Sequence, residues 1–99
     1  MTKMTVSEFK FSLAQASPPK GLSLLLQALW HDANGDWGTA HQIAQEVNSP
    51  QGARVHGYLH LREGDRSNAS YWYHHANHSM PITSLEEEWE TIVEELLQP

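Results

Sequence analysis

Gly35-Asp36-Trp37-Gly38-Thr39-Ala40 is the stretch that decides the fold, because its pattern G-D-x-x-x-A returns as Gly64-Asp65-Arg66-Ser67-Asn68-Ala69 after 29 residues. A glycine in the left-handed conformation closes the last carbonyls of a helix, and an aspartate directly after it favours the start of another helix. Each copy therefore predicts a joint between two helices. The same period makes His31 and His60 equivalent, since each stands four residues before its glycine.

The spacing of apolar residues predicts helices on both sides of each joint. Before the first joint, leucine and tryptophan recur at i, i+3, i+4, i+7 and i+8 from Leu22 to Trp30, which is one broad helical stripe. We therefore expect two helix hairpins, at about residues 22–47 and 51–77. Pro50 lies where the first turn of the second hairpin is expected, a position that proline favours.

Two further helices are expected at the ends of the chain. Residues 5–15 alternate in part like a strand, but the spacing of Val6, Phe9 and Leu13 favours a short helix. Ser84 followed by Glu87 has the capping-box pattern and opens a last helix at about 85–97. Because this helix has a strongly acidic outer face, it is suited to cap a stack of helices.

The composition favours a single domain over residues 1–99. A chain of 99 residues is long enough to bury a core of its own. The absence of cysteine excludes disulfides and thiolate metal sites. The first ten residues lack the apolar core of a secretory signal, so we expect a cytoplasmic protein.

The charge argues against polyanionic partners. The chain has a formal net charge of −6 and only six lysine and arginine residues. Non-specific attraction to phosphates needs clustered positive charge. We therefore expect neither nucleic acid nor a membrane surface as a partner.

The second hairpin resembles a tetratricopeptide repeat, a helix-turn-helix unit in which small residues allow two helices to approach closely. Gly57 stands at the small position of the first helix. Ala69, Tyr73 and Ala76 stand at the small, aromatic and small positions of the second helix, and Pro81 stands at the closing proline. The resemblance implies an all-α stack of two hairpins with a short N-terminal helix and a C-terminal capping helix.

The first hairpin follows the same pattern more loosely. Ala28 and Ala40 match it, whereas Ala44 replaces the aromatic residue, Val47 the last small residue and Gly52 the proline. The period of 29 residues is also shorter than the usual period of about 34. We therefore expect the stacking to deviate from a regular superhelix.

Several longer stretches are similar to a family of small uncharacterised bacterial and fungal helical-repeat proteins. The resemblance strengthens the expected fold and implies no activity. The stretches are Ala28-Leu29-Trp30-His31-Asp32-Ala33, Gly35-Asp36-Trp37, Val55-His56-Gly57-Tyr58-Leu59-His60 and Tyr71-Trp72-Tyr73.

The histidines allow two interpretations. His56 and His60 are four residues apart and share one helix face, which is a metal-binding spacing. Stacking of equivalent helices would add His31 to a zinc site, with His41 as a further candidate. The repeat register instead places His56 and His60 at packing positions, and we favour this structural role.

In the structural interpretation each buried imidazole needs a hydrogen-bond partner. The candidates are Asp36, Asp65 and the carbonyls near the two glycines.

We expect a non-catalytic interaction module that binds a peptide or protein segment, without a cofactor. Neither a nucleophile elbow nor a phosphate-binding loop is present to indicate an enzyme. Exposed apolar ends of the stack make a homodimer a further expectation. The alternative function is a small histidine-based metal-binding protein or metal-dependent enzyme that uses a divalent ion such as zinc. The residues expected to line the peptide groove are His41, Arg54, Tyr58, Arg62 and Tyr71, of which the two arginines would hold a carboxylate.

Overall fold

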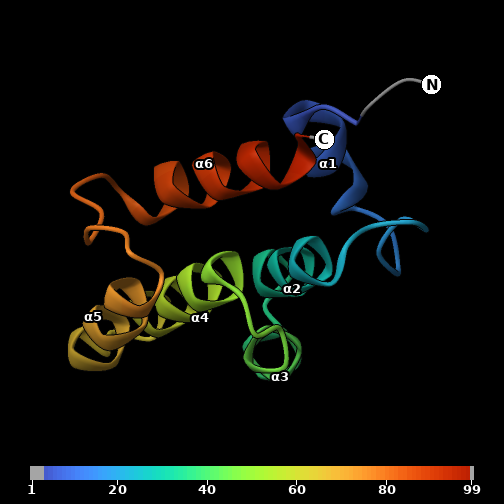
Figure 1. Ribbon diagram of the computed structural model, residues 1–99. Helices are drawn as coiled ribbons and strands as arrows, with labels where there is room; N and C mark the ends of the chain where they lie inside the picture. The colour runs from blue at the N-terminus through green and yellow to red at the C-terminus, as the bar shows by residue number, and fades with distance from the viewer. Residues whose placement is uncertain (1–3, 99) are drawn as a thin grey trace.

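A computed structural model describes residues 4–98, and this part of the chain is all helical, with no strand, as the sequence predicts (Figure 1). The expected helix at the N-terminus forms, the two joints separate paired helices, and the last helix begins where the capping box predicts it. The helices are α1 (Val6–Ser12), α2 (Leu24–Ala33), α3 (Trp37–Gln45), α4 (Pro50–Arg62), α5 (Arg66–His75) and α6 (Leu85–Leu97).

Every helix in the described residues begins at a side chain that caps it. In each case a serine, threonine or aspartate oxygen accepts a hydrogen bond from the backbone N–H three residues further on. This bond satisfies one of the N–H groups that the first helical turn leaves without a partner. The capping residues are Thr5, Ser23, Asp36, Ser49, Asp65 and Ser84.

The two Gly-Asp joints have the same geometry. Gly35 and Gly64 have φ angles of 84° and 86°, the left-handed conformation that glycine adopts without strain. The N–H of Asp36 donates to the carbonyl of His31 at 2.9 Å, and the N–H of Asp65 donates to the carbonyl of His60 at 2.8 Å. These bonds close the end of α2 and of α4 while each aspartate caps the next helix.

Helix α4 lies at the centre of the arrangement and packs against α2, α3, α5 and α6. Helix α6 returns over α2 and α4, and its C-terminal end lies beside α1 (Figure 1). The helices expected as hairpin partners pack as pairs, α2 with α3 and α4 with α5. The last helix thus covers the first helix of each hairpin, and it does not continue the stack beyond α5.

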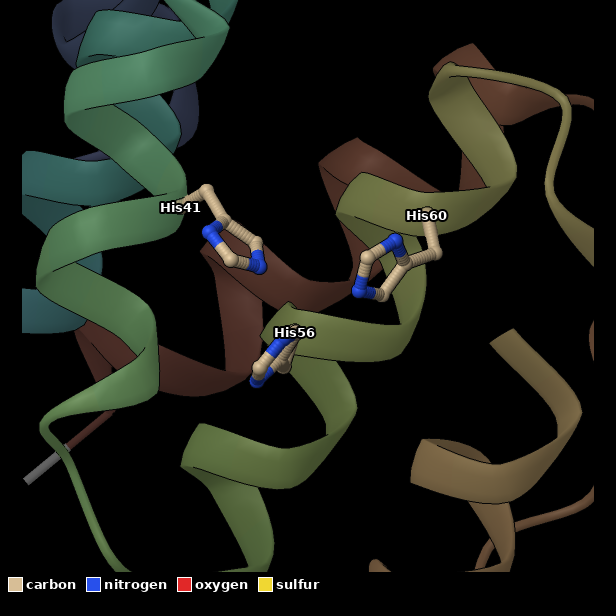
Figure 2. Close-up of side chains that lie close together, drawn as sticks. All are labelled: His41, His56 and His60. Atoms are coloured by element: carbon tan, nitrogen blue, oxygen red, sulfur yellow. The ribbon is translucent and has the colours of Figure 1, made fainter. Parts of the chain in front are cut away.

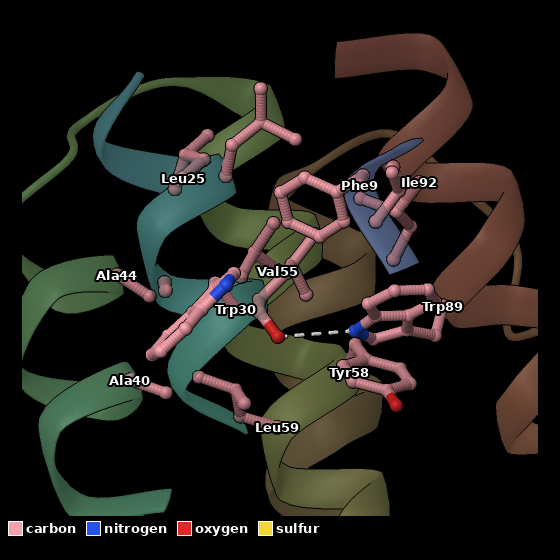
Figure 3. Close-up of a cluster of buried hydrophobic side chains, with 14 residues drawn as sticks. Phe9, Leu25, Trp30, Ala40, Ala44, Val55, Tyr58, Leu59, Trp89 and Ile92 are labelled. Atoms are coloured by element: carbon pink, nitrogen blue, oxygen red, sulfur yellow. Dashed lines mark hydrogen bonds between the residues drawn. The ribbon is translucent and has the colours of Figure 1, made fainter. Parts of the chain in front are cut away.

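Aromatic side chains fill the core between α6, α2 and α1 (Figure 3). Trp89 on α6 packs against Phe9, with ring centroids 5.7 Å apart, and its indole N–H donates to the carbonyl of Leu29 at 3.2 Å. Trp30 on α2 donates to the hydroxyl of Ser12 at 3.2 Å. The indoles thus bury apolar area while their N–H groups keep hydrogen-bond partners.

Helices α4 and α5 pack closely at Gly57. A β-carbon at this position would lie 2.7 Å from Cδ2 of the Tyr73 ring and 3.2 Å from the carbonyl oxygen of Ala69. Tyr73 and Ala69 are both fully buried, so neither has room to move aside. The absence of a side chain at Gly57 therefore sets the distance between these two helices.

We expect Gly57→Ala to lower the free energy of unfolding by about 1–3 kcal/mol, because overpacking against Tyr73 outweighs the gain in helix propensity of about 1 kcal/mol. Urea denaturation followed by circular dichroism measures the change. Gly38→Ala is the matched control, since a β-carbon on this α3 residue meets no atom within 4 Å. If both variants were at least as stable as the wild type, the close packing at Gly57 would be wrong.

Candidate functional site

The candidate site lies where α3 crosses α4, and Trp37 holds the two helices together there. The indole N–H of Trp37 donates to the carbonyl of Leu59 on α4 at 2.7 Å. His41 follows Trp37 by one helical turn, and the two rings stack with centroids 4.7 Å apart. The anchored tryptophan therefore directs His41 towards α4.

Three histidines meet at this crossing, His41 from α3 and His56 and His60 from α4 (Figure 2). Their ring centroids are 4.6 Å apart for His41 and His56, 5.2 Å for His41 and His60, and 4.9 Å for His56 and His60. One ring nitrogen from each residue lies within 4.8 Å of the other two. We call this group the histidine cluster.

Two tryptophans and one carboxylate surround the histidine cluster. Trp72 on α5 stacks on His56 with centroids 4.0 Å apart, and Trp37 covers His41 on the other side. Nδ1 of His60 is 2.6 Å from a carboxylate oxygen of Glu63. Because a carboxylate only accepts hydrogen bonds, Nδ1 carries the hydrogen, and the lone pair of the neutral ring lies on Nε2.

Burial keeps two of the histidines uncharged at neutral pH. His56 is only 6% exposed, and its pKa is lowered to about 4, mainly by this desolvation. Repulsion from the charged forms of His41 and His60 contributes in the same direction. Desolvation and the charge of His60 also lower the pKa of His41. Neutral imidazoles retain the lone pair that a metal ion or a hydrogen-bond donor needs.

The sequence suggests a zinc site formed by His31, His56 and His60. The structure brings together a different set of histidines. His31 lies on α2, where its ring packs edge-on against Trp30 at 5.2 Å, and it is outside the histidine cluster. The third histidine beside His56 and His60 is His41.

The residues expected to line a peptide groove are dispersed. Tyr58 is 0% exposed and lies in the core, whereas Arg62 and Tyr71 are exposed to solvent. Arg62 pairs with Asp32 at 3.2 Å and donates to the hydroxyl of Tyr58, whereas the sequence analysis expects it to hold a ligand carboxylate. His41 lies in the histidine cluster. These residues therefore do not form one binding surface.

Arg54 forms ion pairs with two glutamates of α6. It is 8% exposed, and its guanidinium donates two bonds to Glu88 at 3.2 Å each and one to Glu95 at 2.9 Å. Tyr73 donates a further bond to Glu88 at 2.7 Å. The arginine that was expected to hold a ligand carboxylate thus holds carboxylates of α6.

Sequence reasoning missed three residues of the site. Glu63 fixes the His60 tautomer, and Trp37 and Trp72 each stack on a histidine, but the sequence pattern by itself gives none of the three a role at a site. The recognisable signals were the i, i+4 spacing of Trp37 with His41 and the i, i+3 spacing of His60 with Glu63.

Comparisons of the chain with models of known protein families, with curated proteins and with solved structures found no match. In the described residues, no helix combines the length and the apolar character that crossing a bilayer requires.

We expect the metal-free protein to lose about 2 kcal/mol of stability through His56 between pH 7 and pH 5. The folded pKa of about 4 lies below the ordinary value of 6.5, so the unfolded chain takes up the proton first as the pH falls. Urea titrations with a chelator present measure this loss. His56→Gln should flatten the pH dependence, whereas the exposed His74→Gln should not; equal curves for all three proteins would contradict the assignment.

We expect Arg54→Met to destabilise the protein by about 3–5 kcal/mol, because it leaves the Glu88 carboxylate buried without its guanidinium partner. The double variant Arg54→Met/Glu88→Gln removes both charges and keeps an acceptor for Tyr73, so it should recover most of this loss. Denaturation midpoints of the three proteins provide the test. A double variant no more stable than Arg54→Met would show that the ion pair is not the cause.

Proposed function

We propose that this protein binds a divalent transition-metal ion through His41, His56 and His60. The observation that carries the proposal is the convergence of three imidazole nitrogens from two helices, all within 4.8 Å of one another. A single H-x-x-x-H spacing is common on helices without a metal. A third histidine from a separate helix, held in place by Trp37, makes the group a specific donor set.

The spacing of the donors suits an ion after a small inward rotation of the rings. Two nitrogens bound to one tetrahedral zinc ion at about 2.0–2.1 Å lie about 3.3 Å apart. The donor atoms of the histidine cluster are separated by up to 4.8 Å. Binding would therefore need the rings of His41 and His60 to turn inward about their side-chain bonds.

The protonation of the site also favours a metal. His41 and His56 are neutral near pH 7 because burial lowers the pKa of each. Glu63 accepts from Nδ1 of His60 and directs Nε2 to the cluster. A carboxylate behind a ligating histidine orients the ring and raises its basicity, which is a common arrangement around protein metal ions.

The donor set selects the kind of ion. Imidazole nitrogen suits zinc, copper, nickel and cobalt, whereas calcium and magnesium need oxygen ligands. Three protein ligands leave one position of a tetrahedral ion for water or another small ligand. An ion at this position would connect α3 to α4 and therefore join the two hairpins.

We expect the purified, untagged protein to bind one equivalent of Zn²⁺ or Co²⁺ and to melt several degrees higher with the metal, because the ion binds only the folded chain. Calorimetric titration gives the stoichiometry and affinity. The absorption of bound Co²⁺ reports its coordination, and quenching by Cu²⁺ reports proximity to Trp37 and Trp72.

Two variants separate a built site from casual binding to a histidine-containing surface. His41→Ala should abolish the high-affinity equivalent, and Glu63→Gln should weaken it about tenfold. His31→Ala is the matched control, because His31 occupies the position of the first hairpin that His60 occupies in the second, yet it lies outside the histidine cluster. Equal weakening by His31→Ala and His41→Ala, or no binding by the wild type, would refute the proposal.

A further inference from the structure

A pocket lies beside His56, which also belongs to the histidine cluster. The pocket has a volume of about 430 Å³ and opens between α5 and the turn that joins α3 to α4. Its volume is in the range of about 300–1,000 Å³ that small-molecule sites occupy. His56, Trp72, Gln45 and Asn48 are among the residues that line it.

The α5 side of this pocket is aromatic. Tyr71 stands perpendicular to Trp72, with centroids 5.2 Å apart and an interplanar angle of 89°, and His75 meets Tyr71 edge-on at 4.5 Å. Trp72 itself is fixed by its stack on His56. Tyr71 is 56% exposed, so this rigid group offers a ring to the solvent beside the pocket.

The pocket carries no formal charge. Within the part of the chain that the structure describes, its lining contains no Asp, Glu, Lys or Arg, although the chain as a whole has 18 such residues. The polar residues of the lining include Gln45 and Asn48, each of which carries a side-chain amide. An amide offers both a donor and an acceptor, which matches the edge of a nitrogen-containing ring.

We propose that this pocket binds a small, planar, uncharged heteroaromatic molecule, such as a free nucleobase. The ring of the ligand stacks on the exposed aromatic wall at Tyr71, and its polar edge meets the amides of Gln45 and Asn48. A flat ring is favoured over an aliphatic one of the same size because stacking needs a π face. The lining contains no lysine or arginine, so no guanidinium or ammonium group there would hold a phosphate. This proposal does not depend on a metal in the histidine cluster.

The test is a titration of the ¹⁵N-labelled, metal-free protein with adenine, followed by amide and indole chemical shifts. We expect saturable shifts confined to residues 44–56 and 71–75, with a dissociation constant on the order of 1 mM or below, as for a ligand of this size. Cyclohexanol is the non-planar probe and adenosine monophosphate the charged one. Cyclohexanol should cause no saturable shift, and the monophosphate should bind no more tightly than adenine.

The matched variants are Tyr71→Ala and Phe11→Ala, since both remove an exposed aromatic ring and only the first lies at the pocket. Tyr71→Ala should weaken adenine binding about fivefold or more, and Phe11→Ala should leave it unchanged. Absence of saturable shifts, equal binding of cyclohexanol, tighter binding of the monophosphate, or equal effects of the two variants would each overturn the proposal.

Discussion

The whole structure depends on the burial of α4 on all sides. Nine consecutive residues, Gly52 to His60, are buried, and among them are one arginine, two histidines and a tyrosine. A helix in this position needs a partner for each polar side chain, because an unpaired polar group inside a protein costs several kcal/mol. Among these side chains, Arg54 takes its partners from another helix, α6.

The buried polar groups of α4 are accommodated in two different ways. Arg54 reaches Glu88 on α6. Tyr58 accepts a hydrogen bond from Arg62, one turn further along α4, and Arg62 in turn pairs with Asp32 on α2. Burial raises the pKa of Asp32, and Arg62 opposes that rise. Such pairs hold the helices in one relative position. His56 differs, because its contacts are the rings of Trp72, His41 and His60, and it stays neutral. A neutral imidazole among aromatic rings keeps a nitrogen lone pair that can bind a ligand.

Local rules predicted the helices, whereas the site needed information that local rules do not contain. The capping residues, the glycine joints at Gly35 and Gly64 and the apolar spacing act within a few residues, so the sequence shows the helix limits directly. The return of α6 over α2 and α4 depends on a buried pair between Arg54 and Glu88, and in the sequence Glu88 is one of three adjacent glutamates. The position of His41 likewise depends on contacts with residues of another helix, His56 and His60, which the local sequence pattern does not show. The sequence therefore predicts a groove position for His41, and the structure places it in the histidine cluster. The tetratricopeptide resemblance and an interaction role stay predictions.

The pairing of Arg54 with Glu88 also has a consequence for synthesis of the chain on the ribosome. The two residues are separated by 34 positions, so both hairpins leave the ribosome before the arginine meets its carboxylates. Until then the centre of α4 holds a cation without its counter-charge, and the surface that α6 later covers is open to water. Tight closure of α4 therefore waits until α6 has been synthesised.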